Sequence, residues 1–151
     1  MVPREKFRLT GLKNPFKIIV VKIIVDTSIW IDFFKGTLSQ IVASHLIEEL
    51  GNDQVVITDI ILHELLVGAR SKKEYDNLLK LMEPLPVLRI ADSDLPHFNS
   101  YSWKVRKKGL SGKYTDLTIA FLAQYFGCAV LSGDAYFKKL AEKDFVEVIK
   151  F

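Results

Sequence analysis

The chain has 151 residues but only one cysteine, Cys128, and three histidines. A single cysteine excludes a disulfide framework and any zinc site of the cysteine-rich kinds, and this usage is typical of a reducing compartment. The longest apolar run, residues 18–25, is interrupted by Lys22. It is far shorter than the roughly 18 to 20 apolar residues that a membrane-spanning helix requires. We therefore expect a cytoplasmic protein without a membrane segment.

The sequence also lacks the glycine patterns that bind nucleotides. No two of the eight glycines stand two positions apart, and Gly112-Lys113 is followed by Tyr114 rather than by serine or threonine. These absences exclude a dinucleotide-binding fingerprint and a phosphate-binding P-loop. Hydrophobic residues make up 49% of the chain and charged residues 26%, which at this length is typical of one folded domain.

The formal net charge of +3 is unevenly distributed. Residues 1–22 carry six basic side chains and one acidic side chain, which leaves 15 basic and 17 acidic residues in 23–151. The positive charge therefore comes from the N-terminal segment, and the total does not by itself indicate a nucleic-acid partner. The local distribution of charge carries more information.

Short apolar runs alternate with longer helical stretches along the chain. The pattern predicts strands over residues 18–25, 55–58, 87–90, 129–132 and 145–149. It predicts helices over residues 29–35, 38–50, 59–69, 73–82, 92–107, 115–126 and 135–141. Strands that are apolar on both faces and separated by helices indicate a parallel sheet covered on both sides. We therefore expect an α/β fold, a three-layer α/β/α architecture with a five-stranded parallel sheet.

Acidic residues stand where such a fold binds its ligands, beyond the carboxyl ends of the strands. Asp26 ends the first strand, Asp134 follows the fourth, and Asp116 opens the preceding helix. Each also has a purely structural interpretation, since aspartate favours helix N-caps and first turns. Glu64 has helical neighbours Ile60, Ile61, Val67 and Gly68, so it is expected on an apolar stripe, where an uncompensated carboxylate is costly. The alternative is a solvated surface glutamate.

Carboxylates gathered in one place repel each other unless a cation neutralises them. A set of oxygen ligands without cysteine or histidine suits Mg²⁺ or Mn²⁺, and such a centre supports hydrolysis of phosphodiester bonds. Five basic residues and no acid lie in the stretch before Asp116, which suits a phosphate backbone. These candidate RNA-binding residues are Lys104, Arg106, Lys107, Lys108 and Lys113. The alternative is a basic helix end that complements the helix dipole.

Four motifs, in order, resemble those of the PIN-domain ribonucleases and, among them, the VapC-type toxins of toxin–antitoxin pairs. The likeness runs over residues 22–151. The motifs begin at the Ile-Ile-Val that precedes Asp26, at Ile57, at Thr115 and at Leu131.

The resemblance implies a five-stranded parallel sheet and Mg²⁺- or Mn²⁺-dependent endonucleolytic cleavage of RNA. It also implies a homodimer and a VapB-like antitoxin that blocks the acidic pocket. The implied metal-binding and catalytic residues are Asp26, Glu64, Asp116 and Asp134, with Thr27 and Ser132 in supporting positions. Many relatives have a second acid two residues after the fourth, where this chain has Tyr136. Asp32 and Asp59 are interpreted as helix-flanking acids.

The predicted domain boundary separates residues 1–20, an N-terminal extension or a misassigned start, from a PIN domain over residues 21–151. Two alternatives to the toxin remain open. One is a PIN nuclease in RNA maturation or decay without an antitoxin, and the other is a PIN scaffold that binds RNA or a partner without cutting.

Overall fold

A computed structural model describes residues 21–151. The predicted extension, residues 1–20, lies outside the described residues. The five strands of one sheet are β1 (Ile23–Val25), β2 (Val55–Thr58), β3 (Val87–Leu88), β4 (Ala129–Leu131) and β5 (Glu147–Val148). The helices are α1 (Thr27–Lys35), α2 (Gln40–Gly51), α3 (Asp59–Val67), α4 (Lys72–Met82), η2 (Asp92–Asp94, a 3₁₀ turn), α5 (Leu95–Lys107), α6 (Tyr114–Phe126) and α7 (Ala135–Glu142).

All strand pairs in the sheet are parallel, and the strand order is β3-β2-β1-β4-β5. The central strand β1 aligns Ile24 with Val56 on one side and with Val130 on the other. Every residue of β1, β2 and β4 is buried, as expected for strands covered on both faces. The predicted five-stranded parallel sheet is confirmed.

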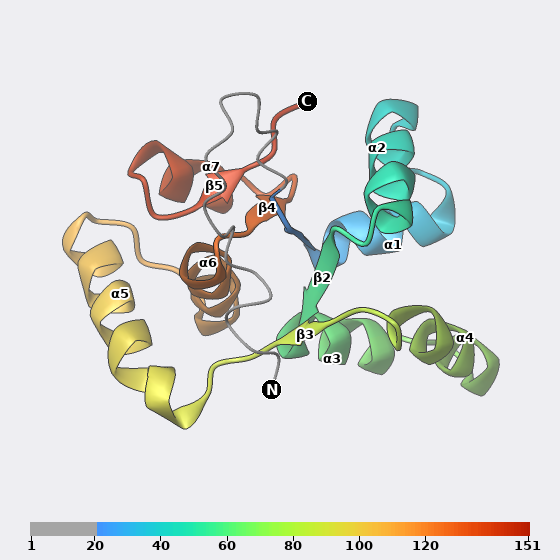
Figure 1. Ribbon diagram of the computed structural model, residues 1–151, viewed down its shortest axis with the longest axis horizontal. Helices are drawn as coiled ribbons and strands as arrows, with labels where there is room; N and C mark the ends of the chain where they lie inside the picture. Colours follow the sequence, from blue (N-terminus) through green and yellow to red (C-terminus); the bar gives the residue numbers. More distant parts are fainter. Residues whose placement is uncertain (1–20) are drawn as a thin grey trace, which may run out of the picture.

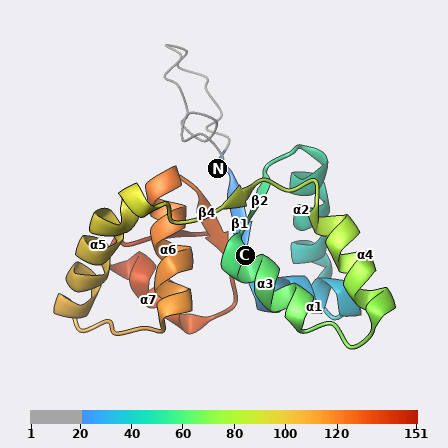
Figure 2. The same cartoon turned by 90° about the horizontal axis from the view of Figure 1, so that it is seen from below.

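The helices form one layer on each face of this sheet. In Figures 1 and 2, α1 to α4 lie on one side of the strands and α5 to α7 on the other. This arrangement follows from the strand order, because chain segments that cross in opposite directions along a parallel sheet must pack on opposite faces. The three-layer α/β/α architecture is therefore confirmed.

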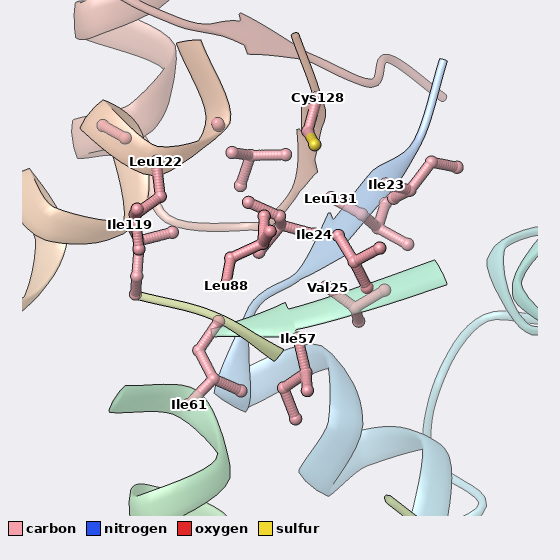
Figure 3. Close-up of a cluster of buried hydrophobic side chains, with 14 of the residues drawn as sticks. Ile23, Ile24, Val25, Ile57, Ile61, Leu88, Ile119, Leu122, Cys128 and Leu131 are labelled. Atoms are coloured by element: carbon pink, nitrogen blue, oxygen red, sulfur yellow. The ribbon is translucent and has the colours of Figure 1, made fainter. Parts of the chain in front are cut away.

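The core lies between the sheet and both helical layers. Figure 3 shows side chains of β1 and β2 together with Ile61 of α3 and Ile119 and Leu122 of α6. Ile24, Ile61 and Leu122 are fully buried. This dense packing holds the carboxyl ends of the strands at fixed positions, which a catalytic or binding site requires.

Several predicted elements differ from the observed ones. The first strand begins at Ile23 in the described part of the chain, the third is limited to Val87–Leu88 and the last to Glu147–Val148. The predicted helix over residues 92–107 is divided into η2 and α5, with Pro96 in the first turn of α5. Proline is compatible with a helix start but not with its interior, so the regular helix begins beside it.

Within residues 21–151, no helix combines the length and apolar character that crossing a bilayer would require.

Candidate active site

The strand order reverses between β1 and β4, and the predicted site residues follow these two strands. In open parallel sheets such a reversal leaves a crevice at the carboxyl ends of the strands. Asp26 directly follows β1, and Ser132 and Asp134 follow β4. Because the register pairs Val25 with Leu131, the two segments leave the sheet side by side.

Ser132 joins the two strand ends through hydrogen bonds. Its hydroxyl donates to Oδ2 of Asp26 at 2.8 Å and accepts from the backbone N–H of Asp134 at 3.0 Å. The other oxygen of Asp26, Oδ1, accepts from the N–H of Thr27 at 2.8 Å, so this carboxylate also caps α1. Asp134 caps α7 by accepting from the N–H of Tyr136 at 2.8 Å. The structural interpretation of these two aspartates therefore coexists with a position at the site.

Glu64 approaches the same place from α3. The hydroxyl of Thr27 donates a short hydrogen bond to Oε2 of Glu64, which connects the first residue of α1 with the middle of α3. The prediction that Glu64 lies on a buried apolar stripe is wrong. Glu64 is exposed and its neighbour Val67 is 68% exposed, because the packed face of α3 is formed by Ile61 and Leu65. Its placement comes from Thr27 rather than from enforced burial.

Asp116 stands in the first turn of α6, half-buried, beside a hollow of about 500 Å³ that Asp134 also lines. Lys113, the residue just before this helix, lines the same hollow. The acidic side chains therefore come from four separate segments of the chain. Each segment follows a strand or opens a helix at the carboxyl edge of the sheet.

The electrostatics show that these carboxylates influence one another. Burial raises the pKa of Asp116 above its ordinary value of 3.8, and the charges of Asp134, Asp26 and Glu64 raise it further, whereas Lys113 lowers it. Burial also raises the pKa of Asp26, while the bonds from Ser132 and Thr27 partly lower it and Glu64 and Asp134 raise it. Excess negative charge is thus concentrated here, and a bound cation would relieve it.

The donor set fits a hard divalent ion. It consists of carboxylate and hydroxyl oxygens, the ligands that Mg²⁺ and Mn²⁺ prefer. Within residues 21–151, no three histidine, cysteine, aspartate or glutamate side chains stand close enough to ligate one ion together. The set therefore fits an ion that binds one or two carboxylates directly and keeps water in its other positions, as Mg²⁺ usually does.

Tyr136 occupies the position at which many members of the resembled family have a second acid. Burial and the nearby charge of Asp116 raise the pKa of Tyr136, and its hydroxyl donates to the carbonyl of Leu110 at 3.4 Å. A Cβ atom added to Gly112 would lie 2.1 Å from the Tyr136 hydroxyl oxygen, so a larger residue there would require the Tyr136 side chain to move. The sequence distinguished Tyr136 only as a departure from the motif, and its contact with Gly112 had no sequence signal.

The basic residues divide into a group without ion pairs within the described residues and a group that forms them. Lys104, Arg106 and Lys107 form the last turn of α5, and Lys108 follows it. Together with Lys113 they are exposed, and within residues 21–151 none of these five forms an ion pair. By contrast, Arg70 pairs with Glu74 at 3.7 Å and Lys72 with Asp76 at 2.6 Å.

The two helix-flanking acids bond locally. Asp59 accepts from the N–H of Ile60 at 2.9 Å, and Asp32 accepts from the hydroxyl of Thr37 at 3.2 Å. Neither is among the charges that raise the pKa of Asp26 or Asp116. Their interpretation as helix-flanking residues agrees with these bonds.

The raised pKa of Asp116 predicts a stability gain from removing its charge. In chelator at pH 7, Asp116→Asn should raise the urea midpoint of unfolding, because the ionised carboxylate of the parent is disfavoured in the folded state. A carboxyl whose pKa is higher folded than unfolded gives its stability below the unfolded value and loses it as pH rises through the folded value. The gain should therefore shrink as pH falls and vanish below about 3.8.

Asp76→Asn is the matched control, since Asp76 is an exposed acid paired with Lys72. It should leave the midpoint unchanged or lower it slightly. Equal gains from both substitutions, or a gain from Asp116→Asn that persists at low pH, would contradict the charge coupling.

Comparison with solved structures finds the same fold in several toxin–antitoxin complexes. VapBC2 from Rickettsia felis, bound to a DNA fragment, aligns with a TM-score of 0.69 and 17% identity over 87% of this chain and 99% of that chain. VapBC-1 from nontypeable Haemophilus influenzae aligns with a TM-score of 0.65 and 21% identity over 86% of this chain and 98% of that chain. VapBC-5 from Mycobacterium tuberculosis aligns with a TM-score of 0.58 and 23% identity over 87% of this chain and 99% of that chain. At these identities the likeness establishes the fold.

A search of curated proteins finds no match to this chain. The family model of the PIN domain matches residues 23–143, which include all four acidic motifs and every strand except β5. PIN domains are generally nucleases. The chain therefore belongs to the PIN domain family.

Proposed function

We propose that this protein is a metal-dependent endoribonuclease and acts as the VapC-type toxin of a toxin–antitoxin pair. The observation that carries the proposal is the charge coupling among Asp26, Glu64, Asp116 and Asp134 at the reversal of strand order. In a family of nucleases, a site of coupled carboxylates with exposed cations nearby suits a phosphodiester substrate and a divalent ion.

Each acidic side chain has a distinct part in the proposed chemistry. A bound Mg²⁺ or Mn²⁺ would supply an activated water and neutralise charge on the phosphate. One or two of Asp26, Asp116 and Asp134 would hold the ion directly and the others through its bound waters, and Glu64 would hold such a water or orient the attacking one. Ser132 keeps Asp26 and Asp134 together, and Thr27 fixes Glu64, so the supporting residues hold the carboxylates in place before substrate arrives.

RNA would bind along the exposed cations beside this site. Lys113 lines the hollow that contains Asp116 and Asp134, so a phosphate there would meet a positive charge at once. Lys104, Arg106, Lys107 and Lys108 continue the positive surface along the end of α5. Cations without acidic partners within the described residues are free to bind phosphate oxygens.

The proposed partner is a VapB-like antitoxin, supported by the toxin–antitoxin complexes that share this fold. A groove of about 680 Å³ between α1, α3 and α4 is lined by Ile31, Phe34 and Leu81 and reaches Glu64. An antitoxin segment with apolar side chains would fit this groove and end at the acidic site. A homodimer of this chain, as the resemblance implies, remains part of the proposal.

Asp116→Asn is expected to abolish cleavage of a mixed pool of structured RNAs in Mg²⁺ or Mn²⁺, because it removes ligand charge at nearly constant size. Ser132→Ala should lower the cleavage rate about 10- to 100-fold, the usual cost of losing a residue that orients a metal ligand. Asp76→Asn should cleave like the parent. Mapping of new RNA ends, with and without chelator, measures all three.

Full activity of the Asp116→Asn protein, or cutting by the parent that continues in chelator, would contradict the proposed mechanism.

The antitoxin proposal predicts growth arrest on expression in a bacterial host, relieved by co-expression of the short open reading frame beside the native gene. Leu81→Asp places a charge in the groove on an exposed side chain, so it should remain toxic but lose that relief. Ile41→Asp is the control, because Ile41 is 74% exposed on α2 and does not line the groove.

Relief of the Leu81→Asp protein as complete as that of the parent would show that the partner binds elsewhere.

A further inference from the structure

Trp103 is a large aromatic side chain placed at the surface without a role in the core. It is 60% exposed on α5, whereas Trp30, the other tryptophan, is 1% exposed. The ammonium of Lys107 lies 5.4 Å from the centre of the Trp103 ring. An exposed aromatic ring among cations has the composition of surfaces that bind single-stranded nucleic acids.

A second hollow, of about 500 Å³, lies beside Trp103, and we call it the Trp103 hollow. Its other lining residues include Arg106, Leu110 and Leu117, so its walls are mainly apolar with one guanidinium. The volume is in the range of about 300–1,000 Å³ that is usual for small-molecule sites. An apolar slot with a planar wall and a cation suits a flat aromatic ligand.

The Trp103 hollow adjoins the acidic site directly. Ser111 and Gly112 line both the Trp103 hollow and the hollow that contains Asp116 and Asp134. The backbone of Gly112 lies against the Tyr136 ring, and a larger residue there would displace that ring. A ligand with an anionic group at the acidic site would therefore need to pass only Ser111 and Gly112 to place an aromatic group beside Trp103.

A buried hydroxyl points to the same hollow. Ser102 lines it, and the Oγ atom of Ser102 is buried with no hydrogen-bond partner in the part of the chain that the structure describes. A buried hydroxyl without a partner is costly. Because Ser102 lines the hollow, a ligand with a polar edge could supply the missing partner.

We propose that the Trp103 hollow binds one unpaired nucleobase of the RNA, next to the nucleotide whose phosphate lies at the acidic site. This rests on the proposed nuclease function and adds to it a base-binding subsite beside the acidic site. An unpaired base exposes the ring face that stacks on Trp103, whereas a base inside a duplex does not. Arg106 and Lys107 follow Trp103 by three and four residues, so both lie beside the indole on α5 and would contact the flanking phosphates.

A second copy of the chain is a less suitable occupant. In a symmetric dimer built on this patch, Lys104, Arg106, Lys107 and Lys108 of both copies would face one another. Like charges brought together at an interface oppose association. Nucleic acid carries the complementary charge.

The test is equilibrium binding of a short single-stranded oligoribonucleotide that contains 2-aminopurine, in chelator so that no cleavage occurs. Stacking on Trp103 should quench the base fluorescence. Trp103→Ala should weaken binding about 5- to 150-fold, the loss of one base–aromatic stack, and remove the quenching. Trp103→Phe should retain most of both. The same oligoribonucleotide in a duplex should bind more weakly and show little quenching.

Two control variants separate stacking from charge and from general disturbance. Tyr114→Ala removes another exposed aromatic ring, 65% exposed and outside the hollow, and should bind like the parent. Lys104→Gln should reduce the slope of log affinity against log salt by about one, whereas Trp103→Ala should leave that slope unchanged.

Binding by Trp103→Ala within twofold of the parent, or equal losses for Trp103→Ala and Tyr114→Ala, would overturn the proposal. So would a fall in sedimentation mass on Trp103→Ala with base quenching unchanged, which would assign the patch to a second copy. Because the binding assay needs no metal, quenching by a parent protein that never cleaves RNA would support the hollow and count against only the nuclease function. Cleavage and binding that are both unchanged by Trp103→Ala would support the nuclease function and count against only the hollow.

Discussion

Repulsion among four carboxylates at one edge of the sheet is the constraint on which the site depends. Burial and mutual charge both raise the pKa of Asp26 and Asp116, so the ionised site is unfavourable in the protein alone. The fold tolerates it because hydrogen bonds from Ser132 and Thr27 hold individual oxygens in place. Beneath them, the buried strands β1 and β4 cannot move apart without opening the core.

The same oxygens serve structure and chemistry. Asp26 and Asp134 each use one oxygen to cap a helix, and Asp26 uses its other oxygen to bind Ser132. Capping fixes the direction of each carboxylate, so that its position at the site costs little additional conformational entropy. A site built this way exchanges some stability for function, as is common where like charges are held together.

Much of the fold could be predicted from the sequence because its signals are local. Apolar runs on both faces of each strand determine a parallel sheet, and an acid directly after a strand must lie at its carboxyl edge, as Asp26 does. Glu64 is exposed although its helical neighbours are apolar, because helix periodicity alone does not determine which face of α3 is packed. The hollow beside Trp103 and the contact of Tyr136 with Gly112 could not be predicted, because they depend on how separate elements pack. Tyr136 and Gly112 are 24 positions apart in the chain, and the hollow is formed between α5, the loop after it and α6.

Metal binding by the acidic cluster is the central claim, and calorimetric titration of the purified protein with Mn²⁺ tests it most directly. We expect saturable binding that Mg²⁺ competes for, at least tenfold weaker binding by Asp116→Asn, and unchanged binding by Asp76→Asn. Binding should also weaken as pH falls, since protons compete for Asp26 and Asp116, whose pKa values are raised. A parent protein that binds Mn²⁺ no better than Asp116→Asn would contradict the account.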